Sequence, residues 1–153
     1  MTMIEDRTAM QVALAEARLA GEAGEVPIGA VVMRKGTIIA HGQNRVLRDL
    51  DPTAHAEIVA LRAAAAALGN YRLPGCSLYV TLEPCAMCAG AMIHARIDRL
   101  VFAAADPKAG AAGSVLSVVN YPQLNHRMQV EQGILGDEAA ELLRSFFRER
   151  RES

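Results

Sequence analysis

The chain has 153 residues, of which 52% are hydrophobic and 22% are charged, a composition that suits one compact soluble domain. Its formal net charge of −1 offers no bulk attraction for nucleic acid, so any such role must come from a local cluster of charges. Three cysteines are too few for a secreted disulfide framework, the first residues lack a signal peptide, and no apolar run reaches the roughly 20 residues of a membrane span. We therefore expect a single cytoplasmic domain without a membrane-spanning segment.

The first half of the sequence alternates between helical and extended patterns. Apolar residues recur at helical spacing over 8–20, which predicts a first helix. Two β-branched runs within 28–46 flank the turn at 34–36 and predict an antiparallel hairpin. Asp51-Pro52 offers an N-cap and a first-turn proline, and the alanine-rich stretch that follows predicts a second helix that ends at Gly69.

The second half continues the alternation with shorter segments. We expect strands over 76–82, 99–104 and 128–134, helices over 88–97 and 136–151, and a shorter helical piece over 113–119. The later strands are separated by helices, whereas the first two are joined by a tight turn. The order therefore predicts an α/β layered domain with a mixed sheet.

Cys85 and Cys88 lie at the start of the helix expected after the strand 76–82. At a spacing of three they face one side of that helix, and the helix N-terminus favours the thiolate form. A thiolate pair of this kind suits zinc. The same strand-to-helix pattern also occurs in thioredoxin-like redox sites, so the pair by itself leaves both interpretations open.

His55 is the histidine best placed to complete a metal site with this pair. His94 points away from the two cysteines on a regular helix, and His41 and His126 lie in hairpin and loop contexts without acidic neighbours. Near the start of a helix, His55 and Glu57 can project past its end toward one site. Three protein ligands and a water are the pattern of a catalytic zinc, and Glu57 is then a proton shuttle that does not bind the metal.

At this point a family resemblance becomes visible. The segments "HAE" at 55–57 and "EPCAMC" at 83–88 match the signature already known for the zinc-dependent cytidine/deoxycytidylate deaminase superfamily. Further blocks resemble the bacterial tRNA-specific adenosine deaminases and together cover nearly the whole chain: "VPIGAVV", "DPTAHAEI", "NYRL", "LYVTLEPCAMCAGAMIHARI", "GAAGS", "LNHR" and "FFRERR".

The resemblance implies a fold and an activity. It implies a cytidine deaminase-like three-layer α-β-α fold with a five-stranded mixed sheet, and a single zinc-dependent deaminase domain over 1–153. It also implies a homodimer that converts the wobble adenosine of a tRNA anticodon to inosine with release of ammonia. One Zn²⁺ per chain is implied on His55, Cys85 and Cys88, with Glu57 activating the water.

The resemblance also implies residues that bind the RNA. Asn44 matches a residue that hydrogen-bonds the flipped nucleotide, and Asp106 matches a loop position beside a neighbouring nucleotide; each is otherwise an ordinary turn residue. Lys108 is implied at a phosphate. The arginines at the chain's end are otherwise the cations expected at a helix C-terminus, and the resemblance assigns them to RNA phosphates: Arg148, Arg150 and Arg151.

Two other functions remain open from the sequence. A free-base or nucleoside deaminase, acting on guanine or cytosine, would share the zinc chemistry and the fold. A non-catalytic zinc module that only binds RNA would not need Glu57.

Overall fold

The computed structural model describes residues 3–152, and these residues form four helices and five strands. In chain order the elements are α1 (Met3–Glu22), β1 (Gly29–Arg34), β2 (Thr37–Gln43), α2 (Ala56–Leu68), β3 (Cys76–Leu82), α3 (Ala86–Ala95), β4 (Arg99–Ala104), β5 (Gln129–Gln132) and α4 (Gly136–Glu152). None of the helices in this described part has the length and apolar character needed to cross a membrane.

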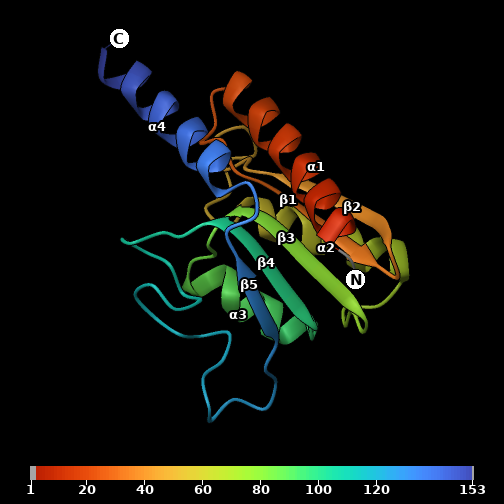
Figure 1. The fold of residues 1–153 in the computed structure, drawn as a ribbon. Helices are drawn as coiled ribbons and strands as arrows, with labels where there is room; N and C mark the ends of the chain where they lie inside the picture. Colours follow the sequence, from red (N-terminus) through yellow and green to blue (C-terminus); the bar gives the residue numbers. More distant parts are fainter. Residues whose placement is uncertain (1–2, 153) are drawn as a thin grey trace.

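The five strands form one mixed sheet in the order β2-β1-β3-β4-β5 (Figure 1). Strand β1 runs antiparallel to both β2 and β3, whereas β3, β4 and β5 are parallel to one another. Lys35 and Gly36 join β1 to β2 with φ angles of 52° and 76°, the left-handed pair that two-residue hairpin turns require. The predicted hairpin and the predicted mixed sheet are confirmed.

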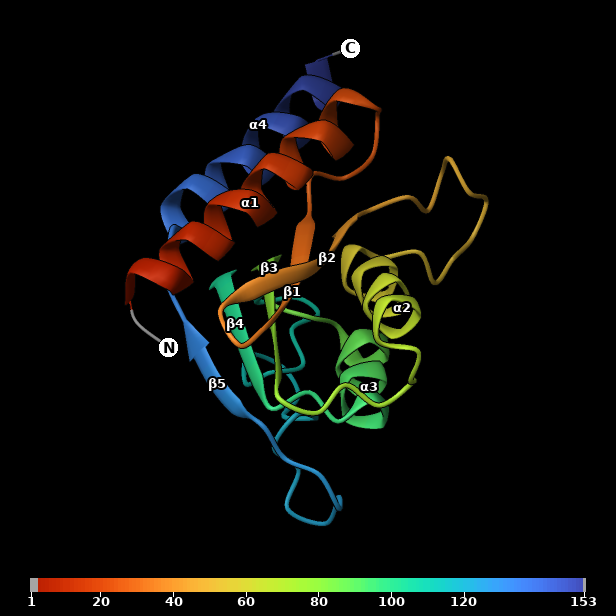
Figure 2. The same cartoon turned by 90° about the vertical axis from the view of Figure 1, so that its right-hand side faces the viewer.

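Helices cover both faces of this sheet. Figure 2 shows α1 and α4 side by side on one face and α2 and α3 together on the other. Strand β3 supplies both interfaces, because successive side chains alternate between faces: Leu78 and Val80 belong to the core under α2 and α3, and Tyr79 belongs to the core under α1 and α4. This is the expected three-layer α-β-α arrangement.

The predicted start of the second helix and the predicted helical piece over 113–119 are wrong. In both places a carboxylate side chain accepts a backbone N–H group. The second helix begins at Ala56 with His55 as its N-cap, because the Asp51 carboxylate accepts the Thr53 N–H and hydroxyl in a turn before the helix. The stretch 113–119 forms no helix, because the Ser114 N–H and hydroxyl are donated to the carboxylate of Glu83.

Gly42 allows α2 to approach the edge strand β2 closely. A Cβ atom at this position would collide with the carbonyl oxygen of Ala56 and would lie 2.6 Å from the backbone nitrogen of Ala60. The first turn of α2 therefore rests directly on the backbone of β2. This contact places the N-terminus of α2, and with it His55, at one end of the sheet.

Candidate metal centre and active site

The N-termini of α2 and α3 meet where β3 ends. Three residues, Glu83, Pro84 and Cys85, lead from β3 to the start of α3. His55 and Cys85 are the N-cap residues of the two helices, both with extended backbone and neither with a side-chain capping hydrogen bond. Their side chains are thus available to point past the helix ends, beside the carboxyl end of a parallel strand where α/β proteins usually bind ligands.

The donor atoms of His55, Cys85 and Cys88 form a compact group. The Nδ1 atom of His55 lies 3.6 Å from the Sγ atom of Cys85 and 3.5 Å from that of Cys88, and the three donor atoms all lie within 4.8 Å of one another. Nitrogen and sulfur ligands on a tetrahedral zinc are about 3.6 Å apart, as the usual Zn–N and Zn–S bond lengths require. The group fits a metal ion with three protein ligands and one open position.

The ionisation of this group also suits a cation. Hydrogen bonds from the Cys88 thiol and the His55 ring lower the pKa of Cys85 to about 3. The hydrogen bond to Cys85 raises the pKa of His55, and donation to Cys85 raises the pKa of Cys88. One thiolate is therefore present at neutral pH without a metal, and a bound cation would displace the remaining protons.

Glu57 stands next to this group without belonging to it. It is the second residue of α2 and only 4% of its surface is exposed. Burial raises the pKa of Glu57 to about 7, and the charges of His55 and Cys85 act on it as well. A buried carboxyl beside an open metal position can hold and release protons there.

Asn44 lies at the same end of the sheet. It directly follows β2, and the last residue of β2, Gln43, pairs with Gly29 at the start of β1. The start of β1 in turn lies beside the end of β3, because the residue after Gly29 pairs with Val80. The Asn44 side chain is 7% exposed, its Nδ2 atom donates to the Val26 carbonyl, and its buried Oδ1 atom accepts no hydrogen bond. A buried acceptor without a donor is uncommon, and it is available to a ligand.

Asp106 and Lys108 lie in the loop after β4. This loop starts beside the end of β3, because Ala104, the last residue of β4, pairs with Leu82. Asp106 is half-buried, and its Oδ1 atom accepts the N–H groups of Lys108 and Ala109. Asp106 is thus a turn-forming residue, as one interpretation of the sequence held, and it follows β4 at the end of the sheet where β3 leads to Cys85. The Lys108 side chain is exposed.

The arginine-rich end is not brought into this site. Arg148 is twelve residues beyond the start of α4, which corresponds to about 18 Å along the helix, and α4 extends away from the sheet (Figure 1). Arg148, Arg150 and Arg151 are exposed as expected. Arg150 nevertheless has internal partners, because its Nη2 atom donates to the Gly24 carbonyl and its guanidinium lies 4.2 Å from the Phe146 ring centroid.

The other sulfur and imidazole groups stand apart from the donor group. His41 contacts Glu16, His126 donates to the Ile97 carbonyl, and His94 is exposed on α3. Cys76 is a buried thiol at the start of β3.

Two buried carboxylates that bind loop N–H groups were not anticipated from the sequence. Glu25 accepts the N–H groups of Leu47 and Arg48 in the loop after Asn44, and Glu83 accepts N–H groups of the loop that contains Asp106. Burial opposes the charge of each, but these hydrogen bonds outweigh it and lower the pKa of both Glu25 and Glu83. For Glu83, the signal available in the sequence was an acidic residue directly after a buried strand, in "VTLEPC".

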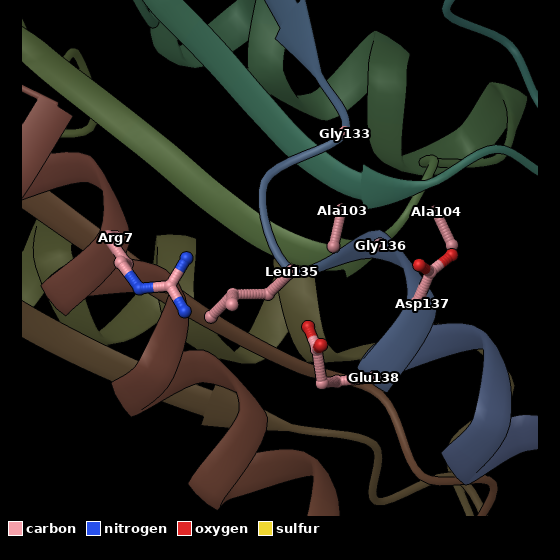
Figure 3. Close-up of a pocket in the computed structure, with 8 residues that line it drawn as sticks. All are labelled: Arg7, Ala103, Ala104, Gly133, Leu135, Gly136, Asp137 and Glu138. Atoms are coloured by element: carbon pink, nitrogen blue, oxygen red, sulfur yellow. The ribbon is translucent and has the colours of Figure 1, made fainter.

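A separate pocket of about 460 Å³ lies between α1, the end of β4 and the start of α4 (Figure 3). Its lining residues are Arg7, Ala103, Ala104, Gly133, Leu135, Gly136, Asp137 and Glu138. Asp137 and Glu138 are in the first turn of α4, where the helix dipole favours acidic groups. The helix accounts for these charges, and the donor group does not line this pocket.

Comparison with known proteins finds relatives over nearly the whole chain. The sequence profile of the MafB19-like deaminase family matches residues 4–151. The tRNA-specific adenosine deaminase of Agrobacterium fabrum is 52% identical over 149 residues, which cover 97% of this chain and 98% of that protein.

Solved structures give the same result. A structure from work on A-to-I editing by tRNA:A34 deaminases at the wobble position of transfer RNA matches with a TM-score of 0.86 and 51% identity, covering 89% of this chain and 99% of that chain. The guanine deaminase of Nitrosomonas europaea matches with a TM-score of 0.77 and 31% identity, covering 92% of this chain and 83% of that one. The fold is common to both kinds of deaminase, and the sequence is closer to the tRNA:A34 enzyme.

Proposed function

Since the chain belongs to the MafB19-like deaminase family, we propose that it hydrolyses the wobble adenosine of a tRNA anticodon to inosine and releases ammonia. Relatives at about half identity over nearly the full length act on tRNA adenosine. The observation that carries the proposal within the structure is the buried Glu57 beside the three-donor group. Residues 1–153 act in this proposal as one deaminase domain.

His55, Cys85 and Cys88 hold one zinc ion per chain in this proposal. Two sulfurs and one imidazole nitrogen form a donor set that zinc prefers, and the fourth position stays open. Zinc bound there supplies an activated water at neutral pH. The two thiols must stay reduced to bind the ion, which agrees with a cytoplasmic location.

Glu57 moves the protons of the reaction. The carboxylate accepts a proton from the attacking water and delivers it to a ring nitrogen of adenine as C6 is attacked. The proton of the new C6 hydroxyl then passes through the same carboxylate to the amino group. The C6–N bond breaks as the C6 carbonyl forms, so that adenosine and water yield inosine and ammonia. The buried position of Glu57 keeps bulk water away from these transfers.

Asn44, Asp106 and Lys108 contact the RNA around the target base. The Asn44 Oδ1 atom, which is buried and without a donor, is suited to accept a hydrogen bond from the flipped nucleotide. Asp106 and Lys108 stand at the adjacent loop, and Lys108 is free to reach a phosphate. Arg148, Arg150 and Arg151 contact phosphates farther along the anticodon stem-loop.

A second copy of the chain completes the assembly that we propose. Met87 on α3 is 37% exposed, and Val115, Leu116 and Tyr121 in the loop between β4 and β5 are about half exposed. Large exposed apolar patches are typical of protein interfaces. A homodimer through α3 would cover Met87, and sedimentation or light scattering of the purified protein measures the oligomeric state directly.

The proposed substrate is tested by supplying total tRNA, adenosine, cytosine and guanine separately and measuring inosine and ammonia. We expect inosine in tRNA, with little turnover of the free compounds. Turnover of guanine or cytosine alone would assign the chain to the nucleobase deaminases. A protein that binds zinc and tRNA but deaminates none of the four would be a binding module.

Removing Arg148 and Arg151 together should weaken tRNA binding and flatten its dependence on salt. Each lost phosphate contact should lower the slope of log affinity against log salt by roughly 0.7. Arg150 is retained in this variant, because its contacts with Gly24 and Phe146 hold α4 against the turn after α1. Filter binding across a salt series measures the slope.

Arg127→Ala is the matched control, since it removes one arginine just before β5, at the opposite end of the sheet from the metal group. It should change the slope little. Equal slopes for the unmodified protein and the double variant would leave RNA recognition to the loops around Asn44 and Asp106.

A further inference from the structure

The carboxylate of Glu83 is surrounded by a single loop. Only 2% of Glu83 is exposed. Its Oε1 atom accepts the Asp106 N–H at 3.0 Å and the Ser114 hydroxyl, and its Oε2 atom accepts the N–H groups of Ala112 at 2.9 Å and Ser114 at 3.1 Å. Both oxygens are therefore saturated by residues 106–114.

Gly110 brings the loop into direct contact with this carboxylate. A Cβ atom at position 110 would collide with the carboxyl carbon and lie 2.5 Å from each of its oxygens. The backbone of Gly110 does not have a positive φ, so close approach, and not backbone conformation, explains the glycine. The loop has no room for a side chain at this point.

The same loop is attached to the residue that precedes Cys85. The Ala111 N–H donates to the Pro84 carbonyl at 2.8 Å, so consecutive residues, Glu83 and Pro84, both bind the loop. Asp106 is the first loop residue bonded to Glu83. These hydrogen bonds fix the position of Asp106 relative to Cys85, because Glu83 and Pro84 directly precede Cys85 in the chain.

Glu83 has no cation to neutralise it. Among the salt bridges of the described residues, none includes Glu83. The N–H and O–H groups of the loop stabilise the negative charge of Glu83 in place of a cation. Hydrogen bonds to a charged acceptor are about twice as strong as those between neutral groups. Any other conformation of the loop would leave a buried charge without partners, which is strongly unfavourable.

We propose that Glu83 is a positioning residue for substrate: it holds the loop 106–114 in the conformation that presents Asp106 to the nucleotide beside the target base. It acts through the loop on RNA binding, and it takes no part in metal binding or proton transfer. This inference rests on the proposed function, which supplies the RNA.

Glu83→Gln tests the proposal. Glutamine keeps the shape but places an NH₂ group against loop donors, so part of the loop loses its acceptor. Amide hydrogen exchange at Asp106, Ala112 and Ser114 should speed up at least about tenfold, the change expected when buried donors lose a partner. KM for an anticodon stem-loop should rise by a similar factor, whereas kcat and zinc content should stay near those of the unmodified protein.

Asp6→Asn is the matched control. Asp6 is also a carboxylate with 2% exposure, but it binds Arg99 and Tyr79 under α1, on the other face of the sheet. This variant should lower thermal stability and leave KM unchanged. If Glu83→Gln does not fold, Ser114→Ala removes only one donor and should shift exchange and KM in the same directions by less.

A double variant tests whether Glu83 acts through Asp106. In an Asp106→Ala background, Glu83→Gln should change KM by less than about twofold, because coupled residues are not additive. Equal effects in both backgrounds, an unchanged KM, or loss of zinc in Glu83→Gln would each overturn the proposal. Failure of the unmodified protein to deaminate the stem-loop would instead contradict the proposed function, and the exchange rates would still decide whether Glu83 anchors the loop.

Discussion

Replacing Glu57 by alanine should reduce deamination at least about 10²-fold, because general acid-base catalysis typically contributes 10²–10⁴ and this carboxyl serves more than one proton transfer in the proposed mechanism. Zinc content should not change, since the three donor atoms come from His55, Cys85 and Cys88. tRNA binding should also survive. Single-turnover formation of inosine, measured beside metal content and RNA affinity, separates these three quantities.

Glu57→Gln is the control for packing, since the amide fills the same buried space but cannot shuttle protons. It should lose as much activity as the alanine variant. Normal deamination by either variant would remove Glu57 from the mechanism, and the RNA-binding module would then become the better interpretation.

Replacing His55, Cys85 or Cys88 by alanine should lower zinc content and activity together. Each variant leaves two of the three donors, too few for the sites that zinc usually occupies. In the proposed mechanism the water would then lose the metal that activates it, and a loss of at least about 10²-fold corresponds to the several kcal/mol that such metals contribute. Elemental analysis and inosine formation on the same preparations test the correlation.

Cys76→Ala is the matched control, because Cys76 is a buried cysteine that lies outside the donor group. It should keep one zinc per chain and full activity, apart from a loss of stability from the small cavity. Chelation without loss of activity, or turnover that follows a reversible Cys85–Cys88 disulfide, would favour the thioredoxin-like interpretation.

Local sequence patterns were sufficient for most of the fold. Strands 76–82 and 99–104 were predicted with the bounds that the structure has, since both are short, largely apolar runs that directly follow a turn or polar residue, Gly75 or Asp98. The hairpin followed from glycine at a turn that needs positive φ. These signals depend on neighbours a few residues apart, which a single sequence contains in full.

The donor group was also accessible from the sequence. Thiols three residues apart at a helix start must face one side, and the histidine and glutamate near another helix start can project past its end. That these two helix starts adjoin was a hypothesis that followed from setting the other three histidines aside, and the family resemblance implied the same ligand set. The 3.5 and 3.6 Å contacts of His55 with the thiols show it in the structure.

Other features depended on tertiary structure alone. Glu83 accepts hydrogen bonds from loop groups 23 to 31 residues away in the sequence. Because these hydrogen bonds include the Ser114 N–H, the stretch 113–119 forms a loop and not the predicted helix. The burial of Asn44 and its unpartnered oxygen likewise arise from the packing of several segments. A local sequence pattern indicates which hydrogen bonds a segment can form within itself. It does not indicate that a buried carboxylate far away in the sequence binds the same N–H groups more strongly, because the two come together only when the chain folds.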